Sequence, residues 1–121
     1  MTTLVGVDAL RVAELDLLAR RGWFLKFLFS QEEIDELATA GSICLACRFA
    51  AKEAVLKMLR TCLSGSVPPA QIVIRRSGER ATSVELRGVA AERARALGID
   101  RVDVSISCER GLVIAVALGT A

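Results

Sequence analysis

The most informative features of this sequence are the residue types that it lacks. Among its 121 residues there is no histidine and no tyrosine, and aromatic residues make up only 4%. Without histidine the chain cannot form a Ser-His-Asp triad, a Cys-His dyad or a histidine metal site. Acid–base chemistry must therefore use carboxylates, lysines, cysteines or bound water. The scarcity of aromatic residues also argues against a stacking surface for single-stranded nucleic acid.

Strong net charge and long apolar segments are also missing. The formal net charge is +2, which is too small to favour nucleic acid or an anionic membrane as a partner. No apolar run approaches the ~18 residues of a membrane-spanning helix, and the N-terminus lacks the basic and apolar segments of a secretory signal. We therefore expect a cytoplasmic protein with a single domain over residues 1–121.

Apolar residues, in contrast, are abundant and make up 53% of the composition. A domain of this length has a limited interior, so it cannot bury all of them on its own. Part of the apolar surface is therefore expected to lie in an interface between subunits.

Four cysteines are present: Cys44, Cys47, Cys62 and Cys108. In a chain without an export signal they are expected to be reduced thiols. Cys44 and Cys47 have the spacing of a redox motif, but no βαβ unit surrounds them, and two cysteines alone cannot complete a tetrahedral zinc site. The favoured interpretation is a set of small buried thiols, with redox or metal use as the alternative. Cys108 is likewise either an inert thiol or a nucleophile, and no histidine is available to activate it.

The periodicity of apolar residues predicts an α+β fold with two hairpins and a long buried helix. Ser30 and Glu33 have the spacing of a capping box, at the start of a short helix that ends near Gly41. Segment 112–118 is entirely apolar, and we expect a strand that is central or covered on both faces. The helix over 9–21 is expected to bury one face, formed by Leu10, Ala13, Leu17 and Leu18. The remaining predicted elements are helices at 43–62 and 88–97, strands at 4–7, 71–76, 82–87 and 101–107, and turns at 77–80 and 108–111.

The predicted helix over 43–62 is apolar around most of its circumference and should be largely buried. One stripe along it nevertheless carries three charged residues, Glu53, Lys57 and Arg60, after Phe49. Glu53 and Lys57 are either an ion pair on a helix face or part of a site for a metal ion or a phosphate, since a buried carboxylate needs a partner.

Asp8 follows the first predicted strand and is either a turn residue or helix cap, or a second ligand. If Asp8 and Glu53 converge, their oxygens could hold a Mg²⁺ ion that keeps several waters and bridges to a pyrophosphate. Lys57 would then neutralise phosphate charge. Five arginines are either phosphate contacts or solvent-exposed charges: Arg48, Arg60, Arg75, Arg76 and Arg80.

Three segments of the chain resemble a known family. They are 6–8 (GVD), 48–57 (RFAAKEAVLK) and 104–107 (VSIS). In order and spacing they resemble the holo-acyl-carrier-protein synthases, which are the short bacterial 4'-phosphopantetheinyl transferases, over nearly the whole chain. Segment 28–33 (LFSQEE) is similar to the Leu-Thr-x-x-Glu element of that family.

The resemblance implies the fold of the family, typically a homotrimer with sites between subunits, and its reaction. The phosphopantetheine arm of coenzyme A is transferred to a serine of an apo acyl carrier protein, in fatty acid or polyketide biosynthesis, and adenosine 3',5'-bisphosphate is released. By motif position, Asp8 and Glu53 would hold the Mg²⁺ ion, and Lys57 would act beside them near the phosphates. The coenzyme A pocket would include Arg48, Lys57, Arg60, Ser107 and Cys108.

The sequence departs from the family pattern at several positions. Cys108 stands where the family has a histidine that contacts a coenzyme A phosphate, and Arg60 and Cys62 replace the glycines of a Gly-Thr-Gly segment. Glu14 falls where a basic residue often meets the acidic carrier protein, so like charges would weaken docking there. Two hypotheses follow. One is an active, diverged transferase, which the retained carboxylates and Lys57 favour. The other is a catalytically impaired paralogue that keeps the trimer and binds a carrier protein or another partner.

Overall fold

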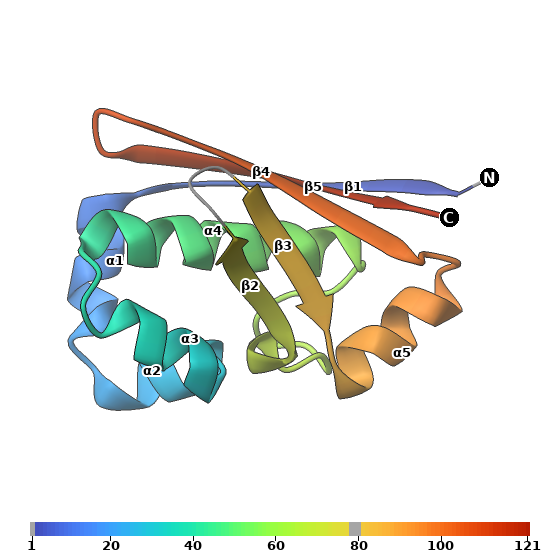
Figure 1. Ribbon diagram of the computed structural model, residues 1–121, viewed down its shortest axis with the longest axis horizontal. Coiled ribbons are helices and arrows are strands. Elements are labelled where there is room, and N and C mark those ends of the chain that lie inside the picture. The colour runs from blue at the N-terminus through green and yellow to red at the C-terminus, as the bar shows by residue number, and fades with distance from the viewer. Residues whose placement is uncertain (1, 78–80) are drawn as a thin grey trace.

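The computed structural model describes residues 2–77 and 81–121. A three-stranded sheet forms one layer, a long helix lies along its inner side, and a two-stranded hairpin and short helices surround that helix (Figure 1). The predicted α+β class is therefore confirmed. In chain order the elements are β1 (Thr3–Arg11), α1 (Val12–Ala19), α2 (Gly22–Leu28), α3 (Gln31–Leu37), α4 (Ser42–Met58), η1 (Pro69–Gln71), β2 (Ile72–Ser77), β3 (Ala81–Leu86), α5 (Gly88–Ala96), β4 (Arg101–Glu109) and β5 (Leu112–Thr120).

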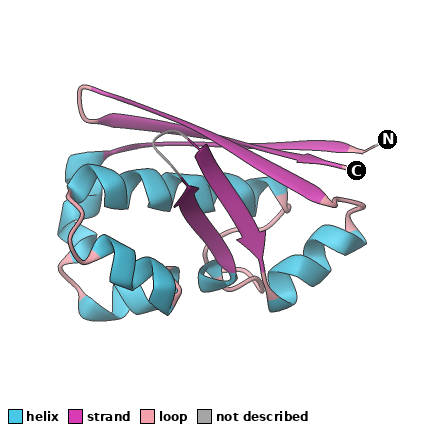
Figure 2. Cartoon of the chain, viewed as in Figure 1, coloured by secondary structure: helices cyan, strands magenta, loops and turns pink. Residues whose placement is uncertain are grey.

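The three-stranded sheet joins the first strand of the chain to the last hairpin. Its strands are antiparallel in the order β1-β5-β4, and β1 pairs with β5 along its whole length. The chain ends lie close together (Figure 2), where the Ala121 N–H donates to the Thr2 carbonyl at 3.2 Å. In the second sheet β2 pairs with β3. Both predicted hairpins, β2–β3 and β4–β5, are therefore present.

Tertiary pairing moves several element ends away from the predicted positions. β1 continues to Arg11 instead of ending at residue 7, because β5 offers it a partner throughout. Asp8 is consequently a mid-strand residue, and the turn or helix cap predicted for it is wrong. α4 ends at Met58 instead of near residue 62, and β4 continues through Cys108 to Glu109, so that only Arg110 and Gly111 form the turn.

The shorter helices confirm one local prediction and correct another. At α3 the capping box is present, since the Ser30 Oγ accepts from the Glu33 N–H and Glu33 Oε1 accepts from the Ser30 N–H. In α1 the buried residue is Leu15, whereas Leu17 and Leu18 are 67% and 42% exposed, so the apolar face expected for this helix is wrong. Within the described residues, no helix has both the length and the apolar composition that crossing a membrane requires.

α4 is the buried centre of the fold, as its apolar circumference predicted. β1 crosses it so closely that a Cβ atom on Gly6 would lie 1.9 Å from the Ala54 carbonyl oxygen. A residue without a side chain is therefore required on the strand at this crossing. Two rows of α4 and the residue after it are fully buried: Ala50, Ala54 and Met58, and Ala51, Val55 and Leu59.

β5 is the central strand, as predicted, but this chain covers only one of its faces. Its inward residues are buried and alternate with exposed outward residues. The prediction of cover on both faces is therefore wrong for the single chain. The large apolar side chains on the outer face of β1 and β5 are 37% to 50% exposed: Val5, Val7, Leu112, Ile114, Val116 and Leu118.

A buried ion pair lies between α3, α4 and η1. Lys52 is fully buried and Glu33 is 1% exposed, and the Lys52 Nζ lies 2.6 Å from Glu33 Oε1. The ammonium also donates to the carbonyls of Pro69, at 3.0 Å, and Ile72, at 2.6 Å, and its nitrogen lies 5.0 Å from the centre of the Phe29 ring. Burial lowers the pKa of Lys52 to about 8, while the charge of Glu33 acts in the opposite direction. Three acceptors thus match the three N–H groups of the ammonium.

The same pair fixes the edge of β2 that faces away from β3. Glu33 Oε2 accepts from the Ile74 N–H at 3.0 Å, and Lys52 donates to the Ile72 carbonyl. Arg48 donates to the Ile74 carbonyl at 2.9 Å. Side chains therefore occupy hydrogen-bonding positions that a neighbouring strand would otherwise take, and they hold α3, α4 and β2 in one arrangement.

Lys52→Met should lower the free energy of unfolding by about 3–5 kcal/mol, because it leaves the Glu33 carboxylate buried without its cation. The matched control is Lys26→Met at an exposed position of α2, which should change the free energy of unfolding by less than about 0.5 kcal/mol. Urea denaturation followed by circular dichroism measures both. The double variant Lys52→Met/Glu33→Gln keeps an acceptor for the Ile74 N–H and should recover part of the loss. No recovery would mean that the isolated charge is not the cause.

Candidate active site

A carboxylate and a lysine meet where β1 crosses α4. Asp8 lies on the inner face of β1 together with Gly6, and its side chain is 13% exposed. The Lys57 Nζ lies 2.9 Å from Asp8 Oδ1 and donates to the Val7 carbonyl at 3.0 Å. Because half of the Lys57 side chain remains exposed, its ammonium can also face a ligand in solvent.

Glu53 adds a second carboxylate to this group. The pKa of Glu53 is raised, first by partial burial and then by the negative charge of Asp8, whereas Lys57 lowers it. The two carboxylates are therefore close enough to repel each other, and they share one ammonium as a neighbour. Glu53 thus lies within range of the charges of both Asp8 and Lys57.

The donor set of this group fits a hard divalent cation. Carboxylate oxygens are the ligands that Mg²⁺ prefers, and an ion between Asp8 and Glu53 would remove the repulsion between them. Over residues 2–77 and 81–121, no three His, Cys, Asp or Glu side chains are grouped closely enough to enclose a metal ion. Two carboxylates therefore fit an ion that keeps several waters, as Mg²⁺ does, and not one held in a complete protein cage.

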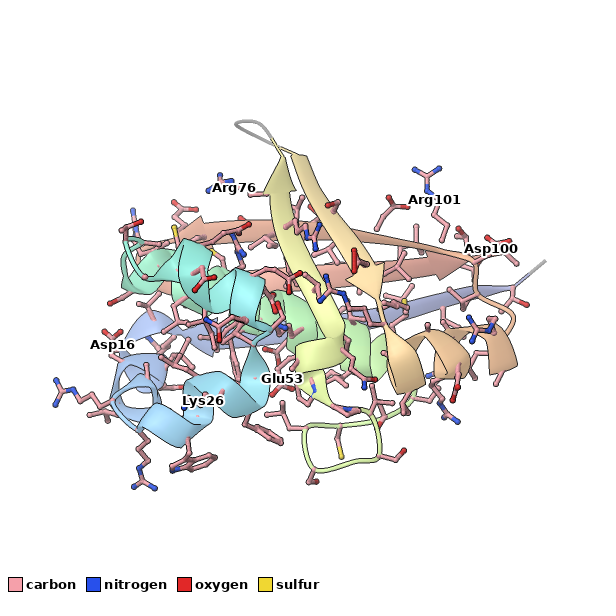
Figure 3. The ribbon with its side chains drawn as sticks, turned by 60° about the horizontal axis from the view of Figure 1, so that its bottom comes forward. Asp16, Lys26, Glu53, Arg76, Asp100 and Arg101 are labelled. Atoms are coloured by element: carbon pink, nitrogen blue, oxygen red, sulfur yellow. The ribbon has the colours of Figure 1, made fainter. Side chains whose placement is uncertain are left out.

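A cavity of about 470 Å³ lies between the first half of α4, β4 and the β2–β3 hairpin. Arg76, near the tip of the hairpin, contributes to it and lies well apart from Glu53 (Figure 3). The cavity combines apolar walls with cationic groups and thiols. Its lining includes Ile43, Ile74, Val104 and Ile106, the arginines Arg48, Arg75 and Arg76, and the cysteines Cys44, Cys47 and Cys108.

Two of the candidate phosphate contacts line this cavity while already bound to carboxylates. Arg48 is 14% exposed, and its Nη2 lies 2.6 Å from Glu36 Oε2. Arg75 Nη2 lies 2.9 Å from Glu32 Oε2. An anionic ligand would therefore have to share these guanidinium groups with Glu36 and Glu32. Arg80 lies outside the described residues.

The cavity does not take in every residue that the family resemblance assigned to coenzyme A. The described residues that line it do not include Lys57, Arg60 or Ser107. Arg60 is exposed just beyond α4, and its φ of 62° lies in the left-handed region that favours glycine. Alternation along β4 places Ser107 on the opposite face from Cys108.

The cysteines are more accessible than predicted. Cys44 and Cys47 are partly buried, Cys62 and Cys108 are exposed, and all four are free thiols. α4 is buried toward the sheet, but the cavity opens the side of its first half that carries Cys44 and Cys47. The prediction of a set of buried thiols is therefore wrong.

Lys52 is the important residue that the sequence analysis missed. It directly precedes Glu53 in the 48–57 motif, and its burial is complete. A charge on a mostly apolar helix needs a partner. Lys52 needs one even more than Glu53 does, because Lys52 is fully buried and Glu53 is only partly buried. Glu33 was recognised only as a helix cap, although the same carboxylate also binds Lys52 and β2.

The sequence and the fold of this chain are both similar to those of known proteins. Residues 4–117 match the 4'-phosphopantetheinyl transferase superfamily. The holo-[acyl-carrier-protein] synthase of Nitratidesulfovibrio vulgaris is 33% identical in an alignment 121 positions long, which covers 94% of each chain. The structure of the Neisseria meningitidis holo-[acyl-carrier-protein] synthase has a TM-score of 0.85 at 28% identity over 98% of both chains. That of the Helicobacter pylori enzyme in complex with coenzyme A has a TM-score of 0.83 at 27% identity, over 97% of this chain and 100% of the other.

The chain therefore belongs to the 4'-phosphopantetheinyl transferase superfamily. Within it, the chain is a phosphopantetheinyl transferase of the holo-acyl-carrier-protein synthase type, with the α+β fold of those enzymes. The resemblance based on segments 6–8, 48–57 and 104–107 is thus confirmed.

In the metal-free protein, Glu53→Gln should raise the free energy of unfolding at pH 8 by about 0.5–2 kcal/mol, because it removes a charge that partial burial and then the nearby charge of Asp8 disfavour. Folding raises the pKa of Glu53 above its ordinary value of 4.5, so the folded protein holds this proton more tightly than the unfolded chain. The wild type should therefore lose stability as pH rises through that pKa, and the advantage of the variant should shrink as pH falls.

Thermal unfolding in the presence of a chelator, at pH 8 and at pH 4, measures this difference. Glu14→Gln, at an exposed position of α1, is the control and should change little at either pH. A variant Glu53→Gln that is less stable than the wild type at pH 8 would contradict the assigned repulsion.

Proposed function

We propose that this protein transfers the 4'-phosphopantetheine arm of coenzyme A to a serine of an apo acyl carrier protein in a Mg²⁺-dependent reaction, releasing adenosine 3',5'-bisphosphate. The observation that carries the proposal is the group formed by Asp8, Glu53 and Lys57 at the crossing of β1 and α4. The names of the similar enzymes, and the coenzyme A in the Helicobacter pylori structure, support the same donor and acceptor. The cytoplasmic location, the single domain over 1–121 and the pathway of the carrier stay predictions.

The reaction needs charge neutralisation and alignment more than covalent help from the protein. The serine oxygen forms a bond to the phosphorus that bears the pantetheine arm, and the bond from that phosphorus to the bridging oxygen breaks. The bridging oxygen leaves with adenosine 3',5'-bisphosphate, and the serine proton passes to a carboxylate or to water. Asp8 and Glu53 would hold the Mg²⁺ ion, which when bound supplies positive charge to the pyrophosphate. The Lys57 ammonium lies beside Asp8 and is partly exposed, so it would contact the phosphates of a bound coenzyme A. No histidine is required for any of these roles.

The proposal is tested by incubating the protein with coenzyme A, Mg²⁺ and a panel of apo carrier proteins, and then weighing the carriers. We expect a mass increase of one phosphopantetheine arm on at least one carrier. Asp8→Asn should abolish it, because one of two metal ligands is lost, whereas Asp16→Asn on α1 should leave it unchanged. No mass increase on any carrier, with coenzyme A still bound, would favour the impaired paralogue. Full activity of Asp8→Asn would refute the metal assignment.

We further propose that one subunit does not form a complete site. Cys44 and Arg48 reach the cavity from one side of α4. Glu53 follows Cys44 by nine residues, which is about two and a half helical turns, so Glu53 and Lys57 leave the helix on roughly the opposite side. A coenzyme A molecule that uses both would span two subunits, with the carboxylates of one and the cavity of the next.

The outer face of the three-stranded sheet supports such an assembly. Its apolar side chains form cross-strand pairs, for example Val7 with Val116 and Val5 with Leu118. An apolar sheet face of this kind is typical of a surface that another subunit covers. A homotrimer built on this face, as the family resemblance implied, would bury it and bring neighbouring sites together.

Mixing two inactive variants tests the shared site. Asp8→Asn removes a metal ligand, and Cys108→Trp fills the cavity from an exposed position. If each site uses two subunits, then co-refolding equal amounts should restore about one quarter of the wild-type activity. Analytical ultracentrifugation of the wild type should report a trimer. A monomer with full activity, or variants that never complement one another, would contradict the arrangement.

A further inference from the structure

Three of the four cysteines meet at one cavity although they lie far apart in the sequence. Cys44 and Cys47 come from the first half of α4, and Cys108 comes from β4, some 60 residues later. Cys62 lies elsewhere, in the loop after α4, where its Sγ is 3.4 Å from the Ser64 Oγ. The proposed transfer reaction uses none of these thiols as a nucleophile or metal ligand.

The backbone explains why the thiols line the same cavity. Alternation along β4 places Cys108 on the same face as Val104 and Ile106, and that face packs against the core around α4. Cys47 lies three residues after Cys44 on the helix, so both share one side of it. Helix and strand thus present their thiols from opposite walls of the cavity.

The electrostatics of Cys47 show that the thiols influence one another. The pKa of the Cys47 thiol is raised, first by burial and then by the neighbouring thiols of Cys108 and Cys44. The positive charge of Arg76 acts in the opposite direction. Cys47 is thus a partly buried thiol that lines the same cavity as the exposed thiol of Cys108 and is near enough to be influenced by it.

We propose that Cys47 and Cys108 form a reversible disulfide that joins α4 to β4 and closes the cavity. The modification site stands on the placement of the two thiols alone. Its consequence, loss of coenzyme A binding, rests on the proposed function, because that function assigns this cavity to coenzyme A.

The oxidant is a low-molecular-weight disulfide, written R–S–S–R. The exposed Cys108 thiolate attacks one sulfur, which forms a Cys108–S–S–R bond and releases one thiolate. The Cys47 thiolate then attacks the Cys108 sulfur, which forms the Cys47–Cys108 bond and releases the second thiolate. The two cysteine protons pass through solvent to the released thiolates. Two cysteines are oxidised and one disulfide is reduced to two thiols, and an external dithiol reverses the change.

The bond would act on the wall of the cavity without unfolding the chain. α4 is fixed to the rest of the protein by its buried rows and by Lys52, and β4 is paired along its length with β5. A covalent bridge between these two walls therefore draws the two sulfurs together across the cavity and holds the walls at that separation. An anionic ligand could then no longer enter beside Arg48 and Arg76.

The modification is tested by treating the full chain with glutathione disulfide and digesting it with trypsin without reduction. We expect peptide 27–48 to be linked to peptide 102–110, and the link to disappear after dithiothreitol. Cys44→Ser and the matched control Cys62→Ser should form the same link. Cys47→Ser should not, and should instead retain glutathione on Cys108. A link that forms equally well in Cys47→Ser, or no link in the wild type, would overturn the assigned pair.

The consequence is tested by calorimetric titration of coenzyme A into the reduced, the oxidised and the re-reduced protein. We expect the oxidised form to bind about tenfold more weakly or worse, and re-reduction to restore the affinity. The Cys108→Ser variant should bind coenzyme A with the same affinity before and after treatment with the oxidant. If the wild type bound coenzyme A equally well with and without the disulfide, the proposal that the disulfide closes the cavity would be wrong. A reduced protein that binds no coenzyme A would instead overturn the proposed function, while the peptide link would still report on the disulfide.

Discussion

The arrangement of this protein depends on one buried ion pair, Lys52 with Glu33. Neither side chain reaches solvent, and together they bind three carbonyl or amide groups of η1 and β2. A buried pair of this kind adds little net stability, because desolvation offsets the attraction, but it strongly penalises any arrangement in which one partner is missing. It therefore specifies how α3, α4 and β2 fit together, and this fit forms one wall of the cavity.

α4 carries a different task on each side. Toward the sheet it presents alanines, which together with Gly6 allow β1 to pass at backbone contact. This close approach sets Asp8 beside Lys57 and within range of the charge of Glu53. The metal ion that we propose there would remove the repulsion between the two carboxylates. The opposite side of its first half carries the cavity, with its arginines and thiols. Because one rigid helix holds Glu53 and Lys57 as well as Cys44, Cys47 and Arg48, the relative positions of these residues follow from its pitch.

Much of this could be predicted from the sequence, and the exceptions have physical causes. The long helix and both hairpins follow from periodicity, and the capping box at Ser30 follows from residue spacing. The length of β1, and hence the mid-strand place of Asp8, depends on pairing with β5, which local patterns do not contain. The partner of Lys52 lies 19 residues away, beyond any helical spacing. The exposed face of β5 could not be predicted because an apolar strand looks the same whether its own chain or another subunit covers it.

The central claim is that Asp8 and Glu53 form one divalent-metal site at the crossing of β1 and α4. Electron paramagnetic resonance of Mn²⁺, used in place of Mg²⁺, measures this binding directly as the loss of the free-ion signal in the presence of coenzyme A. We expect about one ion per chain for the wild type, since two carboxylates, a pyrophosphate and retained waters can together complete the ligand set. We expect strongly weakened binding for Asp8→Asn and for Glu53→Gln. Equal Mn²⁺ binding by the wild type and both variants would contradict it.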